Sequence, residues 1–482
     1  MRFRCYPPFG GPLRPDTDRP LVSAETWCPI WDSARMDVTP DVSRATLRKV
    51  VIRLVPFLGL LYFVNYLDRV NIGFAGPSGM KADLGLTETA FGLASGIFFI
   101  GYLVLEVPSN VALHRFGARR WIARILASWG LVATAMAFVP NETVLYILRF
   151  VLGVAEAGFF PGILLYLTYW FPQNQRAKIV ALFMVAVPVS TALGSTLSSL
   201  IIQYGHGVFG LSGWRFMFLV EGLPAIFLAV VTWFYLTDSP AQARWLTRDE
   251  RQWLSSELAA EQAAVEKQEQ WTLRKALTDS RVLGLALVYG GIVYGLYALG
   301  FFLPTIINGF QEQYGTHYSV VQRGLINAVP YVIGAVVMVL WSRHGDRTGE
   351  RAWHVALPAL VGGLAIPVAL YLGNPFAAMA AVTVCAVGVL AALPTFWALP
   401  STFLSGAAAA AGIALINSIG NISGFAAPYI TGWLKDWTGT QRAGLWVVGA
   451  CMIASAVGVL YLWKRILART RSAVESKQAL PE

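Results

Sequence analysis

Apolar stretches of about 20 residues, repeated along the chain, are the feature that most constrains its fold. Each is long enough to cross the hydrocarbon core of a bilayer, which is about 30 Å thick. They form two groups of six, so the sequence predicts an all-α membrane protein with twelve transmembrane helices in two six-helix bundles. The predicted spans are 50–74, 90–112, 121–139, 143–169, 178–202, 214–236, 282–307, 320–341, 354–372, 376–399, 406–431 and 442–463.

Composition supports a lipid environment for most of the chain. Of the 482 residues, 56% are hydrophobic and 13% are charged, whereas a soluble protein carries about 25% charged residues. The four cysteines are scattered and form no CxxC pair, so neither a disulfide framework nor a zinc site is indicated. They are Cys5, Cys28, Cys385 and Cys451.

The polar segments outside the spans define the domain organisation. Two interpretations of residues 1–35 stay open: translation starts at Met36 and the preceding segment is not part of the protein, or this segment is a disordered tail. The one long charged stretch between the bundles is predicted to be a soluble, partly helical linker. The predicted order is a tail at 1–49, a bundle at 50–237, the linker at 238–281, a bundle at 282–465 and a tail at 466–482.

Lys and Arg are unequally distributed among the connections between spans. Basic connections alternate with basic-poor ones, and the N-terminal segment, the linker and the C-terminal segment fall on the basic side. The positive-inside rule therefore places both termini in the cytoplasm. The net charge of +10 is then explained by basic residues on the cytoplasmic side of the membrane, and no nucleic-acid partner is needed to account for it. The basic connections contain Arg115, Arg119 and Arg120, then Arg176 and Lys178, then Arg343, Arg347 and Arg351.

Two connections repeat the same pattern in the two halves. Residues 114–120 after the second span and residues 345–351 after the eighth both place basic residues around a glycine. This similarity indicates an internal repeat. Many transporters are built from such repeats, with the substrate site near the bilayer midplane between them.

These connections resemble the signature loop of the major facilitator superfamily. The second copy, with Asp346-Arg347, is the closer match, because the first has Leu113 or His114 at the usual acidic position. Residues 65–73, Asn-Tyr-Leu-Asp-Arg-Val-Asn-Ile-Gly, resemble the first-helix motif of the anion:cation symporter family within that superfamily. Further segments that resemble this family are 106–110, 149–158, 214–215, 221–224, 412–414 and 417–421.

The resemblance spans about residues 50–465. It implies a secondary active transporter that imports an organic anion by proton symport with alternating access, in a multi-pass protein of the cell inner membrane. Permeases of this family carry sugar acids such as hexuronates, tartrate, or aromatic acids such as phthalate. Sodium coupling and exchange transport remain alternatives, and the carried acid stays open.

Four charged residues inside predicted spans are the main candidates for function, because an ionised side chain in the bilayer usually faces a cavity or a partner. Arg69 or Arg149 is predicted to hold a substrate carboxylate, which the planar guanidinium matches. Asp68 and Glu156 are predicted to load and release protons, since a carboxyl group in a cavity of low dielectric constant accepts a proton readily. The family resemblance supports these roles. The alternative is that these charges form permanent ion pairs between helices.

The second half has almost no charge in its spans, so its substrate-binding candidates are aromatic or polar. Asn417 and Asn421 are four residues apart and share a helical face, although hydrogen bonding between helices would also explain them. The further candidates are Tyr294, Tyr297 and Trp397.

Two other groups of residues receive different predictions. Arg115, Arg119, Asp346 and Arg347 lie in the signature loops and are predicted gating residues. Glu106 and Glu221 lie beside prolines and are expected to fix helix geometry.

Other classes of membrane protein fit less well. No GxxxxGK[ST] loop for ATP is present, and no HExxH, GxSxG or His/Cys cluster indicates an enzyme. The repeated halves fit a transporter that works by alternating access better than they fit a channel. We therefore expect no cofactor and no metal, and a monomer whose partners are the organic anion, protons and the lipid bilayer.

Overall fold

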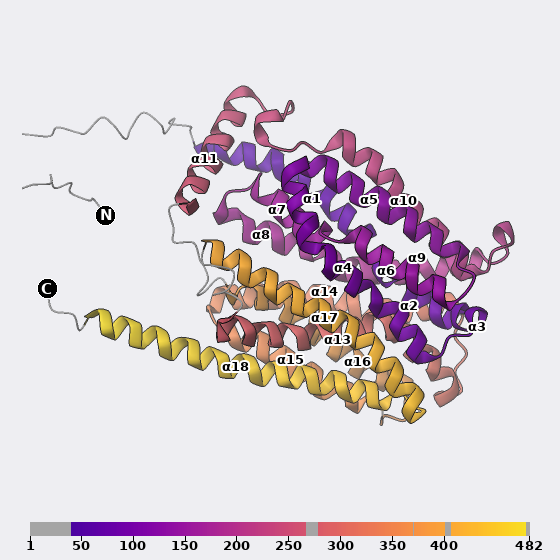
Figure 1. The fold of residues 1–482 in the computed structure, drawn as a ribbon. Coiled ribbons are helices and arrows are strands. Elements are labelled where there is room, and N and C mark those ends of the chain that lie inside the picture. Colours follow the sequence, from indigo (N-terminus) through magenta and orange to yellow (C-terminus); the bar gives the residue numbers. More distant parts are fainter. Residues whose placement is uncertain (1–39, 267–277, 370, 401–405, 479–482) are drawn as a thin grey trace, which may run out of the picture.

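The computed structural model of the chain describes residues 40–266, 278–369, 371–400 and 406–478. The tail before residue 40, with Met36, and part of the linker lie outside the described residues. The described residues form α-helices and short 3₁₀-helices, and no strand is found among them (Figure 1). The predicted all-α class is confirmed.

The N-terminal half follows the six predicted spans, with three of them divided between two α-helices. The predicted span 50–74 is divided into α1 and α2. The predicted span 143–169 is divided into α6 and α7, and 178–202 into α8 and α9. The helices are α1 (Pro40–Val70), α2 (Ile72–Ala75), α3 (Met80–Leu84), α4 (Glu88–Phe116), α5 (Ala118–Ala135), α6 (Glu142–Glu156), α7 (Phe159–Thr168), α8 (Gln173–Met184), α9 (Ala186–Tyr204) and α10 (Gly213–Tyr235).

The C-terminal half contains six long helices, and α11 (Arg248–Glu266) precedes it in the linker. Across the described residues, eleven helices are long and apolar enough to cross a membrane. The ninth predicted span corresponds to α15, which is apolar but has 17 residues, the lower limit of about 17 for a spanning helix. The helices are α13 (Ser280–Tyr314), α14 (Val320–Thr348), α15 (Ala352–Val368), α16 (Pro375–Trp397), α17 (Gly406–Thr438) and α18 (Arg442–Gln478).

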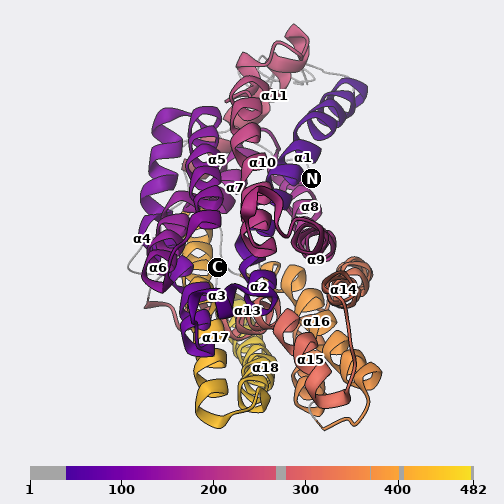
Figure 2. The same ribbon diagram turned by 90° about the vertical axis from the view of Figure 1, so that its right-hand side faces the viewer.

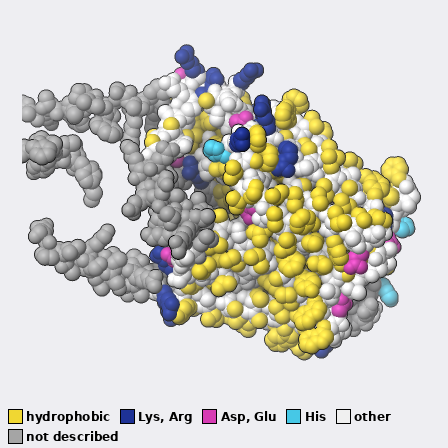
Figure 3. All heavy atoms as spheres, viewed as in Figure 1, with side chains coloured by type: hydrophobic (Ala, Val, Ile, Leu, Met, Phe, Trp, Pro, Cys, Tyr) yellow, Lys and Arg dark blue, Asp and Glu magenta, His cyan; other side chains and the backbone are white. Residues whose placement is uncertain are grey.

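The two halves lie side by side with their long helices roughly aligned (Figures 1 and 2). We call the end that carries α11, the start of α1 and the end of α18 the linker end, and the opposite end, with α2 and α3, the far end. Basic side chains gather towards the linker end, while a broad apolar surface covers the middle of the molecule (Figure 3). Large apolar side chains on this surface, such as Leu131, Phe227 and Val336, are exposed, as expected of helices that face lipid.

At the far end, polar side chains join the two halves. Asp436 at the end of α17 accepts hydrogen bonds from the backbone N–H groups of Glu88 (3.2 Å) and Thr89 (2.7 Å), the first residues of α4. A carboxylate at a helix N-terminus satisfies free N–H groups and complements the helix dipole. Lys435 forms an ion pair with Glu88 (2.6 Å), and the backbone of Val321 in α14 donates to Gln203 in α9 (3.1 Å).

The backbones of α4 and α17 also approach each other very closely at this end. A Cβ atom on Gly92 would lie 2.3 Å from the carbonyl oxygen of Pro428, and one on Gly432 would lie 2.1 Å from that of Glu88. Only glycine fits at such separations, as in other closely packed transmembrane helices. The far end is therefore closed by backbone contact between the halves.

At the linker end, α11 is attached to the N-terminal half by two glutamates. Glu250 pairs with Lys49 of α1 (2.5 Å). Glu261 pairs with Arg176 (3.1 Å) and accepts from the backbone N–H of Gln173 (2.9 Å), the first residue of α8. The described part of the linker thus contains a helix that packs on the first bundle.

Candidate functional site

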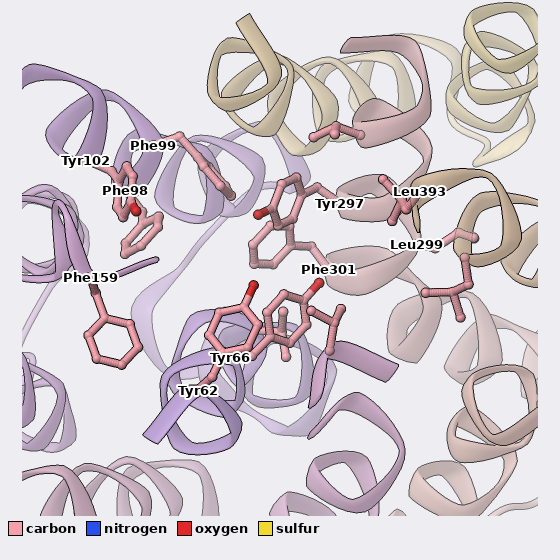
Figure 4. Close-up of a cluster of buried hydrophobic side chains, with 14 of the residues drawn as sticks. Tyr62, Tyr66, Phe98, Phe99, Tyr102, Phe159, Tyr297, Leu299, Phe301 and Leu393 are labelled. Atoms are coloured by element: carbon pink, nitrogen blue, oxygen red, sulfur yellow. The ribbon is translucent and has the colours of Figure 1, made fainter. Parts of the chain in front are cut away.

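A cavity of about 60 Å³ lies between the two halves. Tyr62 and Tyr66 of α1, Tyr102 of α4 and Tyr297 of α13 surround this space (Figure 4). The volume is small beside the roughly 300–1,000 Å³ of typical ligand sites. The remaining lining residues are Arg69, Phe160, Met184, Val187, Pro188, Tyr289, Val293, Leu296, Met338, Leu390, Leu393, Pro394, Asn417, Gly420 and Asn421.

Arg69 is the charged residue that lines this cavity. Its Nη2 atom donates to Oε2 of Glu156 (3.0 Å) and to Oδ1 of Asn65 (3.3 Å), and Nδ2 of Asn65 donates to the same Glu156 oxygen (2.8 Å). All three side chains are buried. The second carboxylate oxygen of Glu156 and Nε of Arg69 are also buried, and the structure gives them no hydrogen-bond partner. The pair therefore retains unused hydrogen-bonding capacity beside the cavity.

The backbone break between α6 and α7 determines where Glu156 sits. The residue is the last of α6, and the chain leaves the helical conformation at Ala157 before Gly158 adopts a left-handed conformation with φ of +81°. A discontinuous helix near the middle of a bundle is a common way to build a transporter site. Residues 143–169 were predicted to form one continuous span, and this break was not predicted.

Replacing Gly158 by Ala should lower the thermal stability of the purified protein. A left-handed conformation costs a residue with a Cβ about 1–2 kcal/mol, and the added atom would lie 2.4 Å from Oγ of Ser109. The measurement is the unfolding midpoint in detergent. Gly59→Ala is the matched control, because a Cβ there meets no atom within 4 Å. Equal midpoints for the two variants would contradict the assigned conformation.

Arg149 lies near Arg69 but has a different environment. It is fully buried, and it donates from Nε to the carbonyl of Ala94 (3.0 Å) and from Nη2 to that of Ser95 (3.3 Å). It is not among the residues that line the cavity. The ring of Phe98 lies 5.2 Å from the guanidinium carbon of Arg69 and 5.3 Å from that of Arg149, so one aromatic ring contacts both cations.

Asp68 points away from its sequence neighbour Arg69. Its Oδ2 atom accepts a hydrogen bond from Nε1 of Trp129 (2.7 Å), and it does not line the cavity. Neighbouring residues in a helix differ by about 100° in direction, so Asp68 faces α5 while Arg69 faces the cavity. Within the described residues, the ion pair of this region is Arg69–Glu156.

Of the five substrate-binding candidates in the second half, some line the cavity and others lie outside it. Tyr297, Asn417 and Asn421 line the cavity. Tyr294 is buried but does not line the cavity. Trp397 also lies outside the lining, where it packs edge-on against the ring of Tyr289 at 4.8 Å.

The predicted gating residues lie at the linker end. The backbone N–H of Arg119 donates to Asp238 (2.8 Å), which ties this loop to the start of the linker. Arg115, Asp346 and Arg347 are exposed. Within the part of the chain that the structure describes, none of these three forms an ion pair.

Several lining residues were not singled out from the sequence. Tyr62, Tyr66 and Arg69 follow a helical i, i+4, i+7 pattern along α1, and Asn65 lies four residues before Arg69. That pattern could have identified the face of α1 that meets the cavity. Tyr102 and Tyr289 carry no comparable signal in the sequence.

Comparisons with known proteins agree with this architecture. Residues 58–428 match the family model described as Major Facilitator Superfamily. A protein of Agrobacterium vitis described as "Putative tartrate transporter" is 49% identical over 443 residues, which cover 92% of this chain and 96% of the relative. The "Quinolone resistance transporter" of Acinetobacter baumannii is 38% identical over 440 residues, which cover 91% of this chain and 100% of the relative.

Among solved structures, the xylose transporter XylE from E. coli, in a partially occluded inward-open conformation, has a similar fold. The TM-score is 0.66 at 18% sequence identity, and the match covers 87% of this chain and 98% of that chain. This likeness confirms the predicted fold, and the family match together with the relatives confirms the predicted superfamily, whose matched members are described as transporters and not as enzymes. The chain is a multi-pass membrane transporter that belongs to the major facilitator superfamily.

Proposed function

We propose that this transporter imports an organic acid anion by proton symport with alternating access, and that tartrate is the first acid to test. The observation that carries the proposal is the buried Arg69–Glu156 pair (3.0 Å) at the wall of the cavity between the halves. A carboxylate substrate needs a fixed cation, and Arg offers a planar group that can bind both carboxylate oxygens.

The coupling follows from competition for Arg69. When Glu156 is ionised it pairs with Arg69, and the substrate carboxylate must compete with it. When Glu156 takes up a proton, Arg69 is free to bind the substrate anion. Release of the substrate and of the proton restores the ion pair, so the two events are linked.

The closed far end supports alternating access. The halves are joined there by Asp436 and by the backbone contacts at Gly92 and Gly432. The excess of basic side chains at the linker end supports a cytoplasmic position for both termini and for the linker. The conformation described here is then closed to the outside, in a protein of the cell inner membrane.

The relatives support an organic acid as the cargo. The Agrobacterium vitis protein described as a tartrate transporter is 49% identical to this chain. Tartrate is small, is doubly charged at neutral pH and carries hydroxyl groups, which suits a cavity lined by Arg69, tyrosines and asparagines. Sugar acids and aromatic carboxylates remain further candidates.

The test is uptake of labelled organic acids by proteoliposomes that contain the purified protein. We expect tartrate to accumulate when the outside is made acidic relative to the inside, and not without a gradient. A sodium gradient and preloaded unlabelled acid test the two alternatives, sodium coupling and exchange. If no acid accumulates in response to an imposed pH gradient, the symport proposal is wrong.

A further inference from the structure

A second set of hydrogen-bond donors lines the same cavity, on the C-terminal half. Asn417 and Asn421 of α17 both donate to Glu106 of α4, from Nδ2 to Oε1 (2.6 Å) and from Nδ2 to Oε2 (3.2 Å). The two asparagines therefore bind both oxygens of a single carboxylate. Such paired, charge-assisted hydrogen bonds are strong and geometrically selective.

The arrangement repeats the pattern seen at Arg69. In both places, donors that line the cavity bind a carboxylate of the protein itself, which is Glu156 at Arg69 and Glu106 at the two asparagines. Neither glutamate is itself among the lining residues. Each donor set thus already shows how a carboxylate fits it.

We propose that Asn417 and Asn421 form a second carboxylate site and that Glu106 occupies this site until a substrate carboxylate displaces it. This inference rests on the proposed function and makes it more specific: the preferred substrate is a dianion. One of its carboxylates binds Arg69 in the N-terminal half, and the other binds the asparagine pair in the C-terminal half. Glu106 is then a specificity-determining residue.

The proposal also accounts for the small cavity. The cavity has a volume of about 60 Å³ while both glutamates are bound to the donors. A dicarboxylate would take over hydrogen bonds that already exist, so the buried donors would not be left unpaired when either glutamate leaves. A monocarboxylate can replace only one of the two and leaves Glu106 bound to the asparagines. Only a dianion can therefore use both donor sets.

The test compares two acids that differ at one end. Tartrate carries two carboxylates, and threonate has a CH₂OH group in place of one of them. Dissociation constants are measured for the purified full-length protein by titration calorimetry. Because Asn417 binds the Glu106 carboxylate in the free protein, Asn417→Ala is made in the Glu106→Gln background, where that charged partner is absent. There we expect it to weaken tartrate binding about tenfold and to leave threonate binding nearly unchanged.

Glu106→Gln tests the other partner. Removing the competing negative charge should tighten tartrate binding and leave threonate binding unchanged. Glu221→Gln is the matched control: Glu221 is also buried and bound by Ser198 (2.7 Å) and Asn71 (3.2 Å), but it does not line the cavity. It should change neither constant. Glu106→Ala, which removes the competing charge together with its hydrogen bonds, takes the place of Glu106→Gln if that variant fails to fold.

The outcomes distinguish failure of the second carboxylate site from failure of the proposed transport function. If the asparagine or Glu106 variants change the binding of both acids by the same factor, the residues only join the two halves, and the second carboxylate site is wrong while the proposed function stands. If the unmodified protein binds neither acid, neither is its substrate and the proposed function fails for this class, together with the inference that rests on it.

Discussion

Replacing Glu156 by Gln should abolish accumulation of substrate driven by a pH gradient and leave exchange of substrate across the membrane largely intact. The amide has almost the same shape and can still accept hydrogen bonds from Arg69 and Asn65, which now bind one oxygen of Glu156. It cannot release or take up a proton, so substrate binding is no longer linked to protonation. The measurements are gradient-driven uptake and counterflow in the same proteoliposomes.

Two other buried acids serve as comparisons for this variant. Glu221→Gln should retain gradient-driven uptake, because Glu221 does not line the cavity. Asp68→Asn tests the other predicted proton-coupling residue, which bonds to Trp129. Loss of coupling in Asp68→Asn but not in Glu156→Gln would transfer the proposed role to Asp68. Loss of folding in Glu156→Gln would instead support the alternative of a purely structural ion pair.

Replacing Arg69 by Lys should raise the KM for tartrate by about ten- to a hundredfold, since hydrogen bonds to charged groups contribute about 1.5–3 kcal/mol each and 1.4 kcal/mol corresponds to a factor of ten. The ammonium keeps the charge but is a point donor, without the planar group that can bind both carboxylate oxygens. The measurement is the initial rate of uptake at increasing tartrate concentration.

Arg149→Lys decides between the two arginines that the sequence left open. Arg149 donates to the backbone carbonyls of Ala94 and Ser95, so its replacement should lower stability and expression rather than change the KM. An unchanged KM in Arg69→Lys together with a raised KM in Arg149→Lys would place the substrate anion at Arg149 and contradict the proposed site.

The all-α fold and the positions of the spans could be predicted because they depend on a local property, the length of apolar stretches. The helix breaks could not be predicted in the same way. Glycine is frequent in transmembrane helices, so Gly158 alone does not reveal that α6 ends after Glu156. Its close approach to Ser109, where a Cβ atom on residue 158 would lie 2.4 Å from Oγ, involves a different helix and cannot be deduced from the local sequence.

The candidate site was predictable for single residues and less so for their partners. Arg69, Glu156, Asn417 and Asn421 were identified because charge and amides are rare in such helices. Their pairing depends on how distant helices meet: Glu106 was expected to fix helix geometry, and its contacts with α17 cross more than 300 positions of sequence. No periodicity within one helix contains that information.

The glycine contacts at the far end also offer a way to trap one conformation of the carrier. Gly92 and Gly432 have room for a hydrogen atom and not for a methyl group while the halves touch. Once α4 and α17 separate, the same positions lose this restriction. A single added carbon would thus select between the two access states without touching any polar group of the cavity. Such variants would be natural starting points for capturing the opposite conformation experimentally.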